Sequence, residues 1–187
     1  LNVLESGFQP DLLIGVWRGG APVAIAIHEL LTYLGLTLDH IPIRTQLYRG
    51  IDTRNERTEV EGLDYIVRRR SPAQRILLVD DVFDTGLSLH RVVEELNRIY
   101  GAATPDIRIA TPWYKPLNNR TPLRPHYHLH ETTAWLVFPH ELCGLSRAEI
   151  LANKPGIDRL RATLLAGGNC GEQAGEIATR AALGSAP

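Results

Sequence analysis

The stretch from residue 76 to residue 89, ILLVDDVFDTGLSL, constrains the fold of this chain more than any other. It begins with four apolar residues, a length typical of a strand buried on both faces of a sheet. Two carboxylates, Asp80 and Asp81, follow at once, and a turn of small residues comes next. The stretch is therefore predicted to form a strand with an acidic tip and a tight loop behind it.

A helix is predicted directly after this loop, because apolar residues recur there at helical spacing and Gly101 is placed to end it. In open α/β sheets, ligands bind at the carboxyl ends of the strands. The amino end of a helix suits a phosphate, and a pair of carboxylates suits a hard divalent cation or a diol. Together these groups predict a site for a phosphorylated sugar.

The stretch resembles the phosphoribosyl pyrophosphate (PRPP) signature of the type I phosphoribosyltransferases, in which an apolar strand, two acids and a D-T-G-x-S/T loop follow in this order. The resemblance covers about residues 12–142. It implies an α/β fold with a central, mostly parallel, twisted sheet flanked by helices, a small hood and a flexible lid loop. An unrelated α/β strand that ends in acids is the alternative, but it would not bring the phosphate loop.

The resemblance also implies roles for the residues of this loop. The 5′-phosphate of PRPP would be cradled by Thr85, Gly86, Leu87 and Ser88. Asp80 and Asp81 would hold the ribose hydroxyls, directly or through water on Mg²⁺, the implied cofactor. Leu87 departs from the many relatives that have Gly, Lys or Arg there, so a basic side chain over the phosphate is lost.

Asp84 occupies the position where relatives place a carboxylate near N7 of the base, which makes it the candidate catalytic acid or base. The alternative is that Asp84 caps the following helix, and the two roles can coexist.

A second strand, loop and helix precede this unit. Residues 12–17 are predicted to be a buried strand, and Pro22 fits the first turn of a helix that ends at Gly35. Between them, glycines would let the backbone approach an anion, and Arg18 adds a bidentate cation. A plain strand-to-helix turn is the alternative. By resemblance, Arg18 and the Gly19 amide would bind pyrophosphate, and the bond that is often cis in relatives would be Trp17–Arg18.

Residues 36–43 are predicted to be the next strand. The polar, charged residues 45–61 are predicted to be a long connection, and the resemblance implies a lid that closes over PRPP. A solvated loop is the alternative. Residues 62–68 alternate in polarity, so we expect a strand that leads out of the lid.

The resemblance places the base site in the second half of the core. After a predicted strand at 106–111, prolines on both sides would hold Lys115 in a rigid loop. Lys115 would donate to the 6-oxo group of a purine, Trp135 would stack on the base, and the backbone of Leu136 would read its edge. An exposed lysine and an ordinary core strand are the alternatives.

Three alternating histidines, His126, His128 and His130, would lie on one face of a strand. Such a row can bind a metal. No acidic or thiol partner stands at a matching offset, so an exposed strand face is the preferred interpretation, with metal binding left open.

The composition suits one globular domain of 187 residues. A net charge of −1 gives no support for a nucleic-acid or membrane partner. Cys143 and Cys170 are too few for a disulfide framework, so a cytoplasmic protein is expected. We expect a core with hood at 1–145 and a helical extension of the same domain at 146–187. The chain begins at Leu1 without a methionine, so residues before it stay open.

These observations predict a purine phosphoribosyltransferase of nucleotide salvage, which transfers the 5-phosphoribosyl group from PRPP to a 6-oxopurine base and releases pyrophosphate. The family is commonly oligomeric, so a homo-oligomer, a dimer above all, is expected. A PRPP-binding regulator without chemistry and a transferase with a different acceptor are the alternatives. The sequence does not rank hypoxanthine, guanine and xanthine.

Overall fold

The computed structural model describes residues 2–49, 56–68, 72–138 and 150. The chain divides into two compact units, Leu1–Ala134 and Trp135–Pro187. All the elements below belong to the first unit. The expected boundary after residue 145, and the helices expected beyond it, fall outside the described residues, so they stay predictions.

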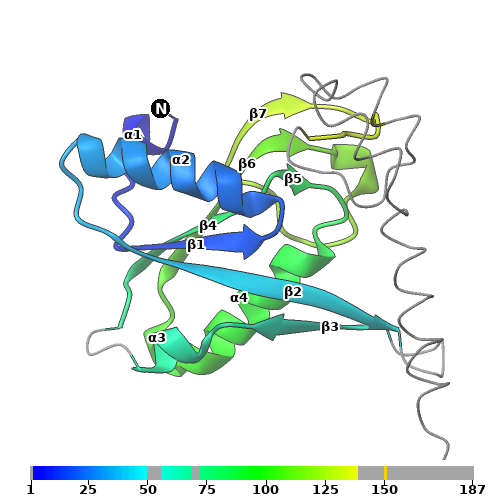
Figure 1. Cartoon of the computed structure of the whole chain (residues 1–187). Coiled ribbons are helices and arrows are strands. Elements are labelled where there is room, and N and C mark those ends of the chain that lie inside the picture. The colour runs from blue at the N-terminus through cyan, green and yellow to red at the C-terminus, as the bar shows by residue number, and fades with distance from the viewer. Residues whose placement is uncertain (1, 50–55, 69–71, 139–149, 151–187) are drawn as a thin grey trace, which may run out of the picture. The chain divides into compact units, whose positions relative to one another are not determined.

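A seven-stranded sheet organises the first unit (Figure 1). Its strand order is β3-β2-β1-β4-β6-β5, with β7 also paired to β6. The β2–β3 pair is antiparallel and every other pair is parallel, which confirms the mostly parallel sheet. The strands are β1 (Leu12–Trp17), β2 (Asp39–Arg49), β3 (Glu56–Glu61), β4 (Arg75–Val79), β5 (Val82–Phe83), β6 (Asp106–Tyr114) and β7 (Tyr127–Glu131).

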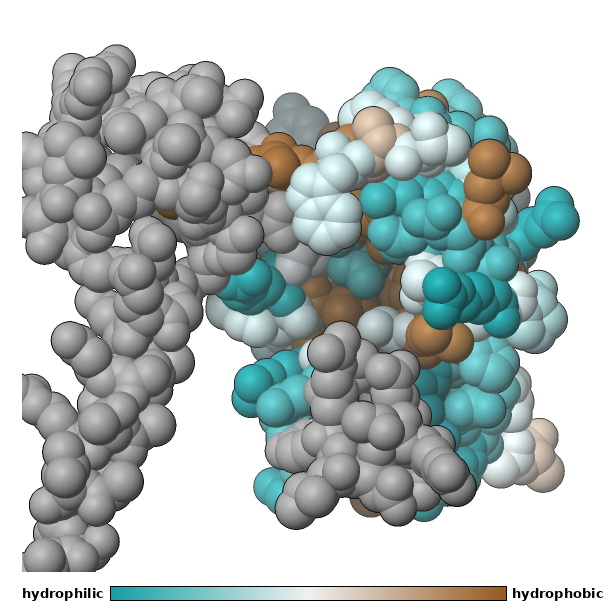
Figure 2. Space-filling view, turned by 90° about the vertical axis from the view of Figure 1, so that its right-hand side faces the viewer, coloured by the Kyte–Doolittle hydropathy of each residue, from teal (hydrophilic) through white to brown (hydrophobic). Residues whose placement is uncertain are grey.

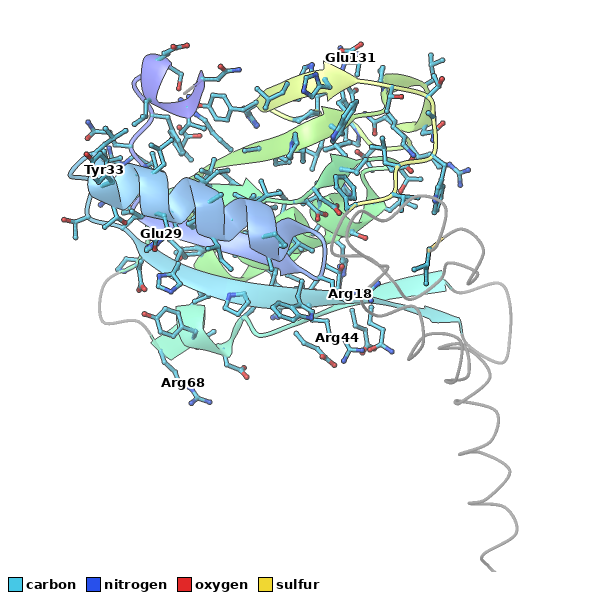
Figure 3. All side chains as sticks on the ribbon, turned by 45° about the horizontal axis from the view of Figure 1, so that its top comes forward. Arg18, Glu29, Tyr33, Arg44, Arg68 and Glu131 are labelled. Atoms are coloured by element: carbon cyan, nitrogen blue, oxygen red, sulfur yellow. The ribbon has the colours of Figure 1, made fainter. Side chains whose placement is uncertain are left out.

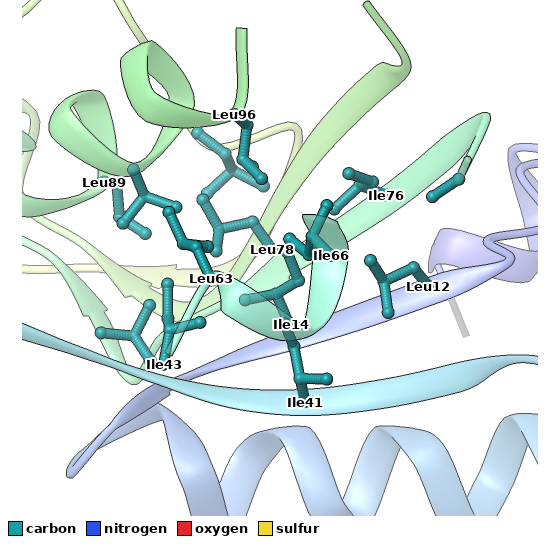
Figure 4. Packing of buried hydrophobic residues seen from close by; sticks show 14 of the residues in the cluster. Leu12, Ile14, Ile41, Ile43, Leu63, Ile66, Ile76, Leu78, Leu89 and Leu96 are labelled. Atoms are coloured by element: carbon teal, nitrogen blue, oxygen red, sulfur yellow. The ribbon is translucent and has the colours of Figure 1, made fainter. Parts of the chain in front are cut away.

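Helices cover both faces of this sheet, as expected for an α/β fold (Figure 1). They are α1 (Asn2–Glu5), α2 (Gly20–Tyr33), α3 (Asp64–Arg68) and α4 (Leu87–Tyr100), with 3-10 turns η1 (Gly101–Ala103) and η2 (Pro116–Asn118). The strand β1 and residues 76–79 of β4 are apolar and send alternate side chains to the two faces. Ile14 and Leu78 pack with Leu89 and Leu96 of α4 (Figure 4). On the other face, Leu13 and Leu77 pack with α2. This core fixes the positions of the loops at the carboxyl ends of β1 and β4.

The helix α2 lies very close to β1. A side chain at Gly15 would meet the Cβ atom of Ala24 at 2.7 Å, so glycine is needed for this approach. Leu31 of this helix is buried, whereas Leu30 and the following Leu34 are 41% and 48% exposed, so the face that packs on the sheet is narrow.

The connection predicted at 45–61 contains more strand than expected. Residues 44–49 of β2 pair with residues 56–61 of β3, and residues 50–55 lie outside the described part. Arg44 lies opposite Glu61 in this ladder, and their side chains form an ion pair at 3.6 Å. A cross-strand pair of this kind helps a polar segment to form a hairpin, which could not be predicted from the charge content alone. Closure of a lid here stays a prediction.

The strand expected at 62–68 is wrong, because residues 64–68 form the helix α3. Gly62 has φ = +94°, which ends β3. Leu63 and Ile66 are both buried, a helical spacing, whereas Tyr65 and Val67 are exposed. The alternating polarity of this segment predicted a strand. The next buried residue after Leu63 is instead three positions further on, as in a helix, and not two.

Candidate active site at the carboxyl ends of the central strands

Two loops meet at the carboxyl ends of β1 and β4. Gly19 and Gly20 of the first loop pack against Asp80 and Asp81 of the second. A side chain at Gly19 would overlap the Asp81 carboxylate, and one at Gly20 would meet the Val79 carbonyl oxygen at 2.5 Å. The predicted pyrophosphate loop and the predicted acid pair therefore form one site, and only glycine permits this contact.

The first loop has the predicted backbone. The Trp17–Arg18 peptide bond is cis, as the family resemblance implied. Arg18 is exposed where β1 passes into α2 (Figure 3). In Figure 2, the side of the unit toward which the strands point is hollowed, with hydrophobic residues at its floor and hydrophilic ones around it. An arginine and backbone groups at such an edge suit an anion that arrives from solvent.

The acid pair is held partly by the scaffold. The Asp81 amide donates to Asp80 Oδ1 at 3.0 Å, and the Asp80 amide donates to the Ala110 carbonyl at 3.2 Å. Burial raises the pKa of Asp80 well above its ordinary value, and the adjacent Asp81 carboxylate raises it further. Two crowded carboxylates of this kind favour a partner that supplies positive charge or hydroxyl donors.

The acid pair fits the expected Mg²⁺ in its donor chemistry. Among the described residues, no group of three or more His, Cys, Asp or Glu side chains surrounds a possible metal position. Mg²⁺ is typically held by one or two carboxylates together with water and substrate phosphates, and not by a complete protein cage. Asp80 and Asp81 offer that smaller donor set.

The loop after β4 leaves the amino end of α4 open. Gly86 precedes the helix with φ = +76°, a conformation that favours glycine, and no side chain caps the helix there. Within the described part of the chain, the amides of Thr85, Gly86 and Ser88 donate no hydrogen bond, and the Leu87 amide makes only a long 3.4 Å contact with Thr85 Oγ1. Such a helix end is suited to bind an anion.

Asp84 is not the cap of α4. Its Oδ2 accepts from Lys115 Nζ at 3.0 Å, and its Oδ1 accepts from Asn118 Nδ2 at 2.7 Å. Burial alone would raise the pKa of Asp84, but the donors Asn118 and Lys115 outweigh it and lower this pKa below its ordinary value. At neutral pH Asp84 is therefore a carboxylate, which can accept a proton but has none to give.

Lys115 is held differently from the prediction. A rigid loop was expected between the prolines on both sides of Lys115. This is wrong for the residues before Lys115, because Pro112 lies inside β6 and the strand continues to Tyr114. The Lys115 amide donates to the Phe83 carbonyl at 2.9 Å, which continues the β5–β6 pairing by one residue. Pro112 is in none of the register pairs that β6 forms with β4, β5 and β7, so its missing amide interrupts no ladder hydrogen bond there. Lys115 is only 5% exposed, so the side chain is not an ordinary surface lysine.

Asn118 and Arg120 were missed by sequence reasoning. Asn118 binds Asp84, and the Arg120 amide donates to the Thr85 carbonyl at 2.9 Å. A polar, proline-containing segment between two strands gives no local pattern that predicts such contacts. The one available signal was its position, since it begins directly after Lys115.

The remaining predicted residues are two in the second unit and three histidines in the first. Trp135 is 81% exposed and Leu136 is half-buried within the second unit, and their roles at the base site stay predictions. The three histidines contact β6 instead of gathering around a metal. His126 Nδ1 accepts from the Ile109 amide, His128 packs edge-on against Tyr114, and His130 packs on Trp113.

Comparison with known proteins agrees with this architecture. Residues 2–143 match the model of the phosphoribosyl transferase domain, and the chain belongs to this family. No curated protein matches the sequence. In the part of the chain that the structure describes, no helix is long and apolar enough to cross a membrane.

Solved structures give the same result. A purine phosphoribosyltransferase from Pyrococcus horikoshii is 28% identical, with a TM-score of 0.56 over 78% of this chain and 86% of that one. A hypothetical protein from Neisseria gonorrhoeae with bound ppGpp is 18% identical, with a TM-score of 0.55 over 89% and 87%. The xanthine-guanine-hypoxanthine phosphoribosyltransferase of Helicobacter pylori is 20% identical, with a TM-score of 0.54 over 72% and 78%. The last two show a shared fold.

Proposed function

We propose that this chain is a Mg²⁺-dependent purine phosphoribosyltransferase, which transfers the 5-phosphoribosyl group from PRPP to a 6-oxopurine and releases pyrophosphate. The observation that carries the proposal is the pairing of Lys115 Nζ with Asp84 Oδ2 at 3.0 Å, beside the open end of α4. The similarity to the Pyrococcus horikoshii enzyme, described as a purine phosphoribosyltransferase, supports a purine acceptor.

The Lys115–Asp84 pair matches one edge of a 6-oxopurine. That edge carries an oxo group, which accepts a hydrogen bond, next to N7, which carries a hydrogen in one tautomer. An ammonium beside a carboxylate is complementary to this order of acceptor and donor. Adenine places an amino group where the oxo group stands, so the ammonium would meet a second donor. The pair therefore favours 6-oxopurines over adenine.

The reaction itself exchanges two bonds at C1 of the ribose. The bond from C1 to the pyrophosphate oxygen breaks and its electron pair leaves with pyrophosphate, while a lone pair of the base nitrogen forms the new bond. Positive charge develops on the ribose ring, and Asp80 and Asp81, which would hold the ribose hydroxyls, would stabilise it. Asp84, held as a carboxylate, accepts the proton that the base gives up.

The other loops bind and orient PRPP. The open amides and hydroxyls of residues 85–88 hold the 5′-phosphate, and Arg18 with the Gly19 amide holds the pyrophosphate. Mg²⁺, held by Asp80 and Asp81, would neutralise the leaving group when bound. Because Gly19 packs on Asp81, the residues that bind the pyrophosphate and those that bind the ribose are held in fixed positions relative to each other. A homodimer in the cytoplasm remains part of this proposal.

Turnover tests the proposal directly. Purified protein is mixed with PRPP, Mg²⁺ and, in turn, hypoxanthine, guanine, xanthine and adenine, and pyrophosphate release is followed. We expect turnover with at least one oxopurine and little with adenine. PRPP binding without turnover of any base would indicate a regulator instead. Turnover confined to a pyrimidine would leave the transferase chemistry in place and overturn the purine acceptor.

A further inference from the structure

The connection from Lys115 to Thr121 packs along the phosphate loop. Asn118 binds the Asp84 carboxylate, and the Arg120 amide donates to the Thr85 carbonyl. The hydroxyl of Thr121 lies so close to Gly86 that a side chain at residue 86 would meet it at 2.7 Å. The connection therefore forms a second wall of the loop that receives the 5′-phosphate.

Arg120 stands at the centre of an ordered turn in this wall. Asn119 Oδ1 accepts from the Thr121 amide at 2.9 Å and from Thr121 Oγ1 at 3.0 Å, which closes a turn across Arg120. Asn119 Nδ2 also donates to the Leu123 carbonyl at 2.8 Å. Because the backbone on both sides of Arg120 is held, its side chain starts from a fixed point beside Thr85.

The guanidinium of Arg120 is available to a ligand. Arg120 is exposed, and it makes no ion pair with a carboxylate among the described residues. It is near enough to Asp84 to contribute, after burial, Asn118 and Lys115, to the lowered pKa of that carboxyl. The charge of Lys115 is already balanced by Asp84 at 3.0 Å.

The phosphate loop needs such a cation. Residues 85–88, Thr-Gly-Leu-Ser, carry no charge, whereas a sugar phosphate brings nearly two negative charges. None of residues 80–84, which lead into the loop, is basic, and Asp84 is already paired with Lys115. Leu87, which projects from the first turn of α4, supplies no positive charge either.

We propose that Arg120 binds the 5′-phosphate of the sugar substrate and supplies the positive charge that the loop itself lacks. The proposal rests on the proposed function for the identity of the sugar phosphate. A guanidinium can meet two phosphate oxygens at once, so Arg120 would complete a cradle made otherwise of neutral amides and hydroxyls. Arg120 is thus a substrate-binding residue of the site, contributed by a connection distant in sequence from the phosphate loop.

The test measures binding of ribose 5-phosphate and of pyrophosphate by calorimetry to four full-length proteins: wild type, Arg120→Gln, Arg120→Lys and Arg124→Gln. Arg124 is the matched control, an exposed arginine four residues after Arg120 that makes no hydrogen bond to residues 84–88 in the described structure. Arg120→Gln should weaken ribose 5-phosphate roughly 10- to 100-fold, as loss of a charged hydrogen bond does. Arg120→Lys should recover part of the affinity, and pyrophosphate binding should not change.

The outcomes separate this inference from the proposed function. Equal ribose 5-phosphate affinity for wild type and Arg120→Gln overturns the inference, and so does an equal loss in Arg124→Gln. Absence of ribose 5-phosphate binding to the wild type also overturns it. Binding that depends on Arg120, in a protein that turns over no purine, supports the inference while the proposed function fails. Circular dichroism of the variants excludes misfolding as the cause.

Discussion

The two strand–loop–helix units of the site both depend on glycine, but only the second also depends on a positive φ. In the first unit, Gly19 and Gly20 are needed because acids of the neighbouring loop pack against them. In the second, Gly86 packs against Phe83 and Thr121 and also has a positive φ, and it leaves the amides at the start of α4 open. The first loop is thus shaped by packing, and the second by packing together with backbone conformation. Under the proposed function, the first loop would bind pyrophosphate and the second the 5′-phosphate.

The helices of the two units differ in what stabilises them. The helix α4 is amphipathic, and its exposed side carries ion pairs among Arg91, Glu94, Glu95 and Arg98. The helix α2 has Glu29 as its single residue among Asp, Glu, Lys and Arg, and it leaves Ile25 and Tyr33 exposed (Figure 3). Stability of α4 therefore owes something to its own side chains, whereas α2 depends on its packing against β1.

The largest effect is expected from removing the proton acceptor of the second unit. Asp84→Asn should lower kcat by roughly 100- to 10,000-fold, the range for loss of a general base. The melting temperature should change little, because asparagine retains an acceptor for Lys115. Arg18→Gln, in the first unit, should instead raise KM for PRPP with a smaller change in kcat. Steady-state kinetics of both variants checks this, and equal profiles would contradict the division of roles.

The next effect separates the two neighbouring glycines of the first loop. Gly19→Ala would push aside the carboxylate of Asp81, a side chain that can rotate, so activity should fall roughly 100-fold as for a small misplacement of catalytic groups. Gly20→Ala would press on the Val79 carbonyl and the Asp80 Cα atom, which cannot move easily. It should cost about 1–3 kcal/mol of stability. Thermal melting should therefore distinguish Gly20→Ala from Gly19→Ala.

A smaller effect is expected from Asn118→Ala, and it concerns pH. The folded-state pKa of Asp84 is lowered, so its carboxylate form is retained until the pH falls through that lowered value. Removing the Asn118 donor raises this pKa, so activity should be lost at a higher pH on the acid side. The profile of kcat/KM against pH measures the shift, with Asn97→Ala, at an exposed asparagine near the other end of α4, as the control. An unchanged acid limb would show that Asn118 does not act on Asp84.

The smallest effect is expected on the outer side of α4. Arg98→Gln removes an exposed contact with Glu95, 2.7 Å from Arg98 Nε, and should cost less than about 1 kcal/mol. Urea unfolding measures this difference, which should shrink further in high salt. Activity should not change, because this end of α4 lies far along the helix from the phosphate loop.

Local sequence patterns predicted the parts of the fold that are determined by residues close together in the sequence. The apolar runs of β1 and β4, the acidic tip and the glycine loops follow from four to fourteen consecutive residues. The hairpin of β2 and β3 did not, because its charges are matched across strands and not along them. The helix α3 was missed because a five-residue element gives too few positions to separate periods of two and 3.6.

The same distinction applies to the site. Asp80, Asp81 and Gly86 were found from one stretch, and Lys115 by resemblance. The partners of Asp84 were not predicted, because Asn118 lies 34 residues away and only the β5–β6 pairing brings it close. An asparagine at residue 118 does not by itself indicate a contact with Asp84. Contacts that depend on how two loops meet require the three-dimensional structure.

The ion pair between Lys115 and Asp84 has one more consequence. Without a ligand, Lys115 and Asp84 already offset each other's charge, and Asn118 adds a second hydrogen bond to Asp84. A ligand that binds to Lys115 or to Asp84 therefore competes with contacts within the protein, and it gains most when it replaces both sides of the pair together. Under the proposed function, this competition would disfavour a base that matches only one of the two groups.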